Sequence, residues 1–156
     1  MKKVYLSLLI LTLMGSTMKT NAQSIYHNEE NVAINGYDLV SYFTDSKAVK
    51  GNSKYTANHN GSIFYFSSLD HKKAFKKNPS KYIPQFDGYC AYAVAAMNKK
   101  VPTNPETFKI VDGKLYLFFN DLYEGKSFNT IEPWNADESN LLNTANGNWE
   151  VLSKEK

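Results

Sequence analysis

Cysteine is almost absent from this 156-residue chain, which contains a single one, Cys90. One cysteine cannot form a disulfide within the chain. Its thiol must therefore be buried in the core, bind a metal, act as a redox or nucleophilic group, or link two chains. The functional hypotheses for this protein differ mainly in which of these roles they assign to Cys90.

Arginine is absent altogether, and all 18 basic residues are lysines. The planar guanidinium group, which binds phosphate groups and base edges through paired hydrogen bonds, is therefore missing. Lys2, Lys3 and Lys19 lie in a segment that we expect to be removed, and the remaining lysines equal the 15 acidic residues in number. Because nucleic-acid binding normally needs a basic surface, the sequence predicts no nucleic-acid partner.

The apolar run near the N-terminus is short. Residues 4–14 follow two lysines and are almost all apolar, but about 11 residues are too few to span a bilayer, which needs roughly 20. Thr20, Asn21 and Ala22 then offer a small-residue cleavage site, which is typical of a secretory signal peptide. We therefore expect an exported protein, periplasmic or secreted, with no transmembrane segment in the mature chain. The expected layout is a signal peptide over 1–22, a flexible N-terminus over 23–30 and one domain over 31–152.

Two dipeptides predict β-hairpins. Asn60-Gly61 and Asp112-Gly113 each lie between two stretches rich in apolar and aromatic residues. Both are dipeptides in which the two turn residues readily adopt positive φ. The expected strands cover residues 54–59, 62–66, 108–111 and 115–119.

Helices are expected around these hairpins. Ser67, three residues before the acidic Asp70, is expected to cap a helix, which Asn78-Pro79 would end. The expected helices cover residues 37–43, 67–77, 88–98, a polar stretch from 120 that is interrupted at 132–134, and 135–144, with a short strand at 32–34. This pattern predicts an α+β fold in which small antiparallel hairpins pack with several short helices in a single domain.

Helical periodicity indicates where the reactive side chains point. His71 is expected on the apolar side of its helix, away from the neighbouring lysines. Cys90 and Met97 are seven residues apart and share one stripe of the following helix with Ala93 and Val94. A thiolate and a thioether on one face suit Cu(I), which prefers soft ligands. Simple core packing explains the same stripe, because free cysteine is among the most buried residue types.

The chain resembles the YHS domain family, in its exported single-domain bacterial form. The resemblance is carried by residues 32–43, 61–68, 74–75, 78–86, 88–94 and 111–117, and spans about residues 31 to 150 of the sequence. It implies a YHS-like domain that binds a metal, with copper as one candidate. In the family that role is associated with two cysteines, whereas the matching regions here, residues 38–41 and 65–68, contain none.

Three functional hypotheses follow. In the first, the protein binds or handles copper or haem without catalysis, with Cys90 as anchor and His71 and Met97 as further ligands. In the second, it is a non-catalytic module in which Cys90 is core and exposed tyrosines, among them Tyr89 and Tyr92, contact a partner protein or a small ligand. In the third, Cys90 is a nucleophile activated by the start of its helix. No paired carboxylates or phosphate-binding loop accompany it.

Overall fold

The structure, a computed structural model, describes residues 25–28 and 30–155. With η marking 3-10 helices, the elements in chain order are η1 (Ile34–Gly36), α1 (Ser41–Thr44), β1 (Asn52–His59), β2 (Ser62–Phe66), α2 (Leu69–Lys77), α3 (Pro79–Tyr82), η2 (Gln85–Gly88), α4 (Ala91–Met97), β3 (Asn104–Val111), β4 (Lys114–Phe118), β5 (Asn120–Tyr123), β6 (Lys126–Asn129), α5 (Ile131–Ala136) and α6 (Glu138–Leu152). The strands pair as three antiparallel hairpins, β1–β2, β3–β4 and β5–β6. The predicted α+β fold is confirmed.

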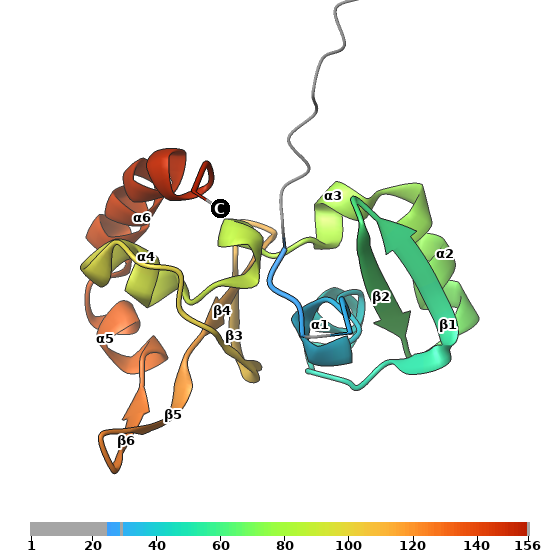
Figure 1. Cartoon of the computed structure of the whole chain (residues 1–156), viewed down its shortest axis with the longest axis horizontal. Coiled ribbons are helices and arrows are strands. Elements are labelled where there is room, and N and C mark those ends of the chain that lie inside the picture. The colour runs from blue at the N-terminus through green and yellow to red at the C-terminus, as the bar shows by residue number, and fades with distance from the viewer. Residues whose placement is uncertain (1–24, 29, 156) are drawn as a thin grey trace, which may run out of the picture.

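Strand β4 lies between two groups of elements (Figure 1). One group contains α1, α2, α3 and the β1–β2 hairpin, and the other contains α4, α5 and α6. Leu115 and Leu117 belong to the apolar cluster of the first group, whereas Tyr116 and Phe118 belong to that of the second. Successive side chains of a strand point to opposite faces, so this one strand closes both cores. The two groups therefore form a single domain.

Both predicted hairpin turns are confirmed. Asn60 and Gly61 join β1 to β2 with φ values of 48° and 84°. Asp112 and Gly113 join β3 to β4 with φ values of 50° and 71°. Asparagine, aspartate and glycine adopt positive φ more readily than other residues, which is why these dipeptides mark the turns.

The polar helix predicted from residue 120 is wrong, because this segment forms the β5–β6 hairpin. Glu124 and Gly125 make its turn, with φ values of 51° and 77°. Pro133 does not interrupt a helix either. It is the third residue of α5, where its missing N–H would have had no partner within the helix. The last helix, predicted over 135–144, is α6 and extends to Leu152.

Three shorter predictions also need correction. Residues 32–34 form isolated bridges and the start of η1 instead of a strand. The helix predicted over 37–43 begins only at Ser41, because residues 39–40 form a turn before α1. The helix predicted over 88–98 begins only at Ala91, since Gly88 belongs to η2 and has a φ of 82°.

The predicted signal peptide, residues 1–22, lies outside the described residues. The described part of the predicted flexible N-terminus, residues 25–28, packs against the domain. Ile25 is 5% exposed, and the Tyr26 N–H donates a hydrogen bond of 2.7 Å to the Asp87 carbonyl oxygen. This stretch is therefore hydrogen-bonded to the backbone of η2.

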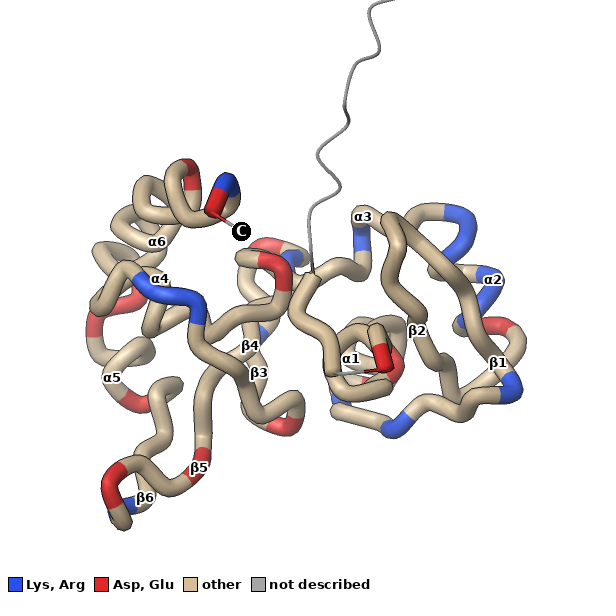
Figure 2. The backbone as a smooth tube through the Cα atoms, viewed as in Figure 1, with Lys and Arg blue, Asp and Glu red and all other residues tan. Residues whose placement is uncertain are grey.

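Lysines and acidic residues occur on both groups of elements (Figure 2). Figure 2 shows lysines grouped on α2 and acidic residues on α5, α6 and the β5–β6 turn. Within residues 25–28 and 30–155, no helix has both the length and the apolar character needed to cross a membrane.

Candidate functional site

Three of the five predicted site residues lie together. Cys90, Tyr92 and Met97 line one groove of about 150 Å³ between α4 and the β5–β6 hairpin. The remaining lining residues are Ala93, Val101, Phe119, Tyr123, Phe128 and Thr130. Cys90, Ala93 and Met97 of the predicted stripe line the groove, whereas Val94 does not. The other side of the groove comes from a hairpin that the sequence did not predict.

The rim of the groove is apolar and exposed. Met97, at the end of α4, is 49% exposed, and Tyr123 and Phe128 of the hairpin are 59% and 41% exposed. Leu122, which precedes Tyr123, is 68% exposed. Single apolar side chains are common on protein surfaces, but a contiguous group of large ones marks an interaction site.

The Cys90 thiol lies beneath the groove and is fully buried. Its Sγ accepts a hydrogen bond from the Phe119 backbone N–H at 3.3 Å and lies 3.3 Å from Thr130 Oγ1. The Thr130 hydroxyl has only one hydrogen, and it donates this to the Phe119 carbonyl at 2.9 Å. When the Thr130 hydroxyl donates to Phe119, its oxygen can accept the Cys90 S–H, which gives the thiol both a donor and an acceptor partner.

These surroundings do not suit a nucleophile. The thiolate is the reactive form of cysteine, and no cationic side chain lines the groove to stabilise it. No histidine lines the groove to act as a base. The arrangement favours packing and ligand contact over covalent chemistry.

The groove offers a metal ion two sulfur atoms, those of Cys90 and Met97. Among the described residues, no group of three or more His, Cys, Asp or Glu side chains is arranged to hold a metal ion. His71, the third predicted ligand, lies on α2, at the opposite end of the molecule from α4 (Figure 1). The structure therefore does not bring His71 to Cys90. Tyr89 is also apart from the groove, with its ring 5.6 Å from that of Tyr26.

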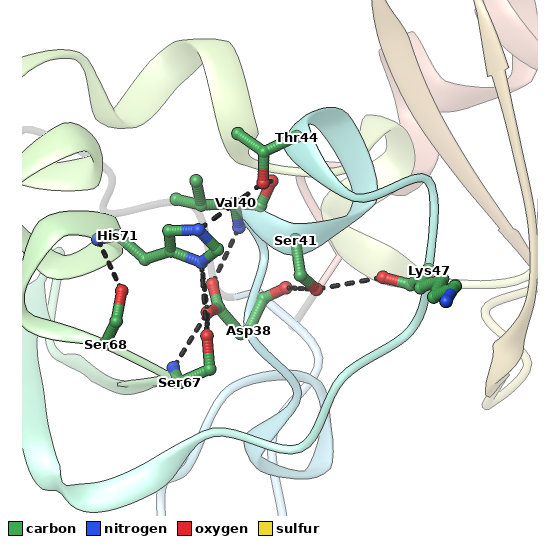
Figure 3. Close-up of polar contacts among 8 residues, drawn as sticks. All are labelled: Asp38, Val40, Ser41, Thr44, Lys47, Ser67, Ser68 and His71. Carbon is green, nitrogen blue, oxygen red and sulfur yellow. Dashed lines mark hydrogen bonds and ion pairs between the residues drawn. The ribbon is translucent and has the colours of Figure 1, made fainter.

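His71 belongs instead to a polar cluster around Asp38 (Figure 3). The Asp38 side chain is fully buried. Its carboxylate accepts four hydrogen bonds, from Val40 N–H (2.9 Å), Ser67 N–H (2.8 Å), the Ser67 hydroxyl (2.6 Å) and His71 Nδ1 (2.7 Å). These bonds connect the turn before α1 to the end of β2 and to α2.

The cluster fixes the hydrogen on the His71 ring. Nδ1 lies near Ser67 Oγ, at 3.2 Å, as well as near the Asp38 carboxylate. The Ser67 hydroxyl already donates to Asp38, so both neighbours of Nδ1 are acceptors and Nδ1 carries a hydrogen. Nε2 lies 3.4 Å from Thr44 Oγ1, which also lies 3.2 Å from the Val40 carbonyl, an acceptor for its hydroxyl. We interpret the cluster as a structural anchor.

Several of these residues were missed from the sequence. Ser67 was expected to cap α2, but Ser68 is the cap, with its hydroxyl accepting the His71 N–H at 3.1 Å. Asp38 shows no local signal, because its partners lie about 30 residues away in the chain. The hairpin rim had one signal, the Glu124-Gly125 dipeptide between two short stretches of equal length.

A scan against protein-family models finds no match to this chain, and searches of curated proteins and of solved structures find none either. The resemblance to YHS domains therefore stays a prediction from the sequence. The groove and the Asp38 cluster are the features of the described residues that bear on function.

Proposed function

We propose that this protein is a non-catalytic binding module that takes an apolar side chain of a partner protein into the groove between α4 and the β5–β6 hairpin. The observation that carries this proposal is the apolar groove itself, which has a buried, hydrogen-bonded Cys90 side chain at its base and an exposed aromatic rim. From the sequence, we further propose that the protein is exported and belongs to the YHS family.

The size of the groove favours a side chain over a cofactor. Its volume is about 150 Å³, whereas sites for drug-sized ligands and cofactors usually measure about 300–1,000 Å³. Cavities of about 150 Å³ with apolar walls hold a group the size of benzene. A haem macrocycle is far larger than that.

The composition of the rim favours a protein partner. Tyrosine, phenylalanine and methionine are enriched at protein interfaces, where a few aromatic anchors contribute most of the binding energy. Tyr123, Phe128 and Met97 are the exposed rim residues. Both charge signs occur on the hairpin beside them, at Asp121 and Lys126 (Figure 2), so the rim can surround an apolar centre with polar contacts.

Side-chain analogues are expected to bind the groove. N-acetyl-phenylalaninamide and N-acetyl-leucinamide should shift the NMR signals of the Met97 and Ala93 methyl groups at millimolar concentration, because both residues line the groove. N-acetyl-glycinamide, which has no side chain, should leave the signals unchanged. Ala93→Leu should remove the shifts by filling the groove.

Ala96→Leu is the matched control for this experiment. Ala96 lies on the same helix but is exposed and outside the groove, so binding should survive. Tyr123→Ala, which changes only an exposed rim residue, covers the case in which Ala93→Leu fails to fold, and should weaken binding. Shifts that are equal for the glycine analogue, or that persist in both groove variants, would contradict the proposal.

Cu(I) binding is a second candidate, favoured by the presence of both sulfur atoms in one groove. Thiolate and thioether ligands suit Cu(I), and Cys90 would have to release its hydrogen to bind it. If the protein holds Cu(I) at this site, an anaerobic titration against a competing chelator should give one equivalent bound. Cys90→Ser and Met97→Leu should each reduce that loading, and unchanged loading in both would reject the candidate.

A further inference from the structure

A second cavity, of about 550 Å³, shares no residue with the Cys90 groove. It lies between the turn of the β1–β2 hairpin, the segment from α3 to η2, and α6. Its walls include His59, Asn60, Gln85, Asp87, Asn146 and Trp149. Its volume falls in the range of about 300–1,000 Å³ that is typical of small-molecule sites.

Asp87 stands out among these residues because its carboxylate lacks a partner. The residue is only 8% exposed, yet no hydrogen bond or ion pair reaches its carboxylate from the described residues. Asp38, the other strongly buried aspartate, accepts four hydrogen bonds. Every fully buried side-chain oxygen in the described part has a partner. The Asp87 carboxylate therefore retains contact with open space, and Asp87 lines both this cavity and a smaller one of about 30 Å³ that shares His59, Asn60 and Ile83 with it.

The electrostatic setting leaves this carboxylate without a cation in direct contact. Burial raises the pKa of Asp87 above its ordinary value, while the charge of Lys100 acts in the opposite direction. The Lys100 ammonium is already engaged. It donates a hydrogen bond of 2.7 Å to the Glu155 carbonyl and lies 5.8 Å from the centre of the Trp149 ring. A buried carboxylate is costly unless it is paired, so a cationic ligand would supply what the protein does not.

The backbone holds Asp87 in a conformation that non-glycine residues rarely adopt. Phe86 and Asp87 have φ values of 54° and 50°, which cost about 1–3 kcal/mol each when the surroundings do not compensate. Gly88 follows with a φ of 82°, and a Cβ at Gly88 would clash with Ile34 Cδ1. Tyr26 N–H donates to the Asp87 carbonyl oxygen at 2.7 Å and so secures the segment. The backbone at Asp87 is thus fixed where the residue lines the cavity.

The same cavity has an aromatic residue in its wall. The Trp149 ring lines the cavity and meets Phe86 edge to face, with 5.7 Å between the ring centroids. Indole is the side chain that attracts cations most strongly through its ring face. Amide groups of Asn60, Gln85 and Asn146 offer additional hydrogen-bonding atoms around the walls. A carboxylate with an aromatic wall is a combination that recognises a cation attached to an apolar body.

We propose that this cavity binds a small organic cation, with its ammonium group against the Asp87 carboxylate and its apolar body against Trp149. This site is separate from the Cys90 groove, so the two proposals stand or fall independently.

Three probes of nearly equal size and different charge test the proposal. Benzylamine is a cation at pH 7, benzyl alcohol is neutral and benzoate is an anion. Benzylamine should bind at least about tenfold more tightly than benzyl alcohol, because its ammonium makes a charge-assisted hydrogen bond to the carboxylate. Benzoate should not bind. Affinities are measured by isothermal titration calorimetry, and the cavity is identified by shifts of the Trp149 indole N–H signal.

Asp87→Asn should abolish the preference for benzylamine while keeping the backbone, because asparagine tolerates positive φ. Asp112→Asn is the matched control, since Asp112 has the same φ of 50° but lies exposed in the β3–β4 turn. Its preference should equal that of the unmodified protein. Equal affinity for benzylamine and benzyl alcohol, no benzylamine binding, or a preference that survives Asp87→Asn would each overturn the proposal.

Thermal stability provides a second readout of the same variant. The pKa of Asp87 is higher in the folded state than its ordinary value of 3.8, so ionisation of this group opposes folding. That penalty is absent below pH 3.8 and is complete once the pH exceeds the folded-state pKa. Asp87→Asn should therefore raise the melting temperature at pH 7 and have no such effect at pH 3. A lower melting temperature at pH 7 would show that the carboxylate has a stabilising partner, and would overturn the proposal.

Discussion

Replacing Asp38 with alanine is expected to destabilise the protein by about 3 kcal/mol or more, because several hydrogen-bond donors lose their shared buried acceptor. The Asp38 carboxylate is the common acceptor for Val40, Ser67 and His71. Without it, two backbone N–H groups and a histidine ring lose their acceptor inside the core, and each buried unsatisfied group carries a penalty of about 1–3 kcal/mol. Urea unfolding at pH 7 measures the loss.

Asp70→Ala is the control for this change. Asp70 forms an ion pair in which its Oδ1 lies 3.6 Å from Lys73 Nζ, and both side chains are exposed. Exposed pairs contribute about 0–1 kcal/mol, so this variant should unfold almost as the unmodified protein does. If Asp38→Ala were no more harmful than Asp70→Ala, the cluster could not be the anchor that we describe. Small domains are stable by only about 5–15 kcal/mol, so the expected loss is a large share of the total.

The three hairpins show which parts of the fold could be predicted from the sequence and which could not. Two hairpins were predicted because Asn60-Gly61 and Asp112-Gly113 are local signals that determine local backbone angles. The third hairpin was missed because Glu124 seldom adopts positive φ, although it does so here at 51°. The antiparallel pairing of β5 with β6, and not the local preference of Glu124, closes that turn.

The candidate site follows the same division. Helical periodicity predicted that Cys90 and Met97 lie on one side of their segment, and both line the groove, although Cys90 precedes the first residue of α4. The partners of Cys90 are Phe119 and Thr130, which lie 29 and 40 residues away. No pattern within a helix identifies such partners. The hydrogen-bonded state of the thiol, on which the choice between packing and catalysis depends, therefore required the structure.

The role of Gly51 was likewise invisible in the sequence. Gly51 precedes β1 and does not need a positive φ. It is required because its Cα faces the backbone of β2, where an added Cβ would lie 2.5 Å from the Tyr65 carbonyl carbon and 2.6 Å from its oxygen. The pairing of β1 with β2 is irregular just beyond this point, between Asn52 and Thr56. A glycine is needed there because the backbones of β1 and β2 approach each other closely.

Gly51→Ala is therefore expected to lower the free energy of unfolding by about 3 kcal/mol, at the upper end of what overpacking usually causes. Backbone atoms cannot rotate away as a side chain can, so β1 would have to move and would lose the bond from Gly51 N–H to the Gly36 carbonyl (2.9 Å). Gly147→Ala should have the opposite effect. Gly147 lies inside α6 with no atom within 4 Å of an added Cβ, and alanine is favoured over glycine in a helix by about 0.5–1 kcal/mol.

The difference in sign between these two glycine variants is the critical observation. Both remove one glycine and add one methyl group, so the change in the unfolded chain is nearly the same for each. Urea unfolding of the two proteins side by side therefore isolates the folded-state contact between Gly51 and Tyr65. A stabilising Gly51→Ala would mean that a methyl group fits between Gly51 and the Tyr65 backbone, and that close approach of β1 to β2 does not require a glycine at this position.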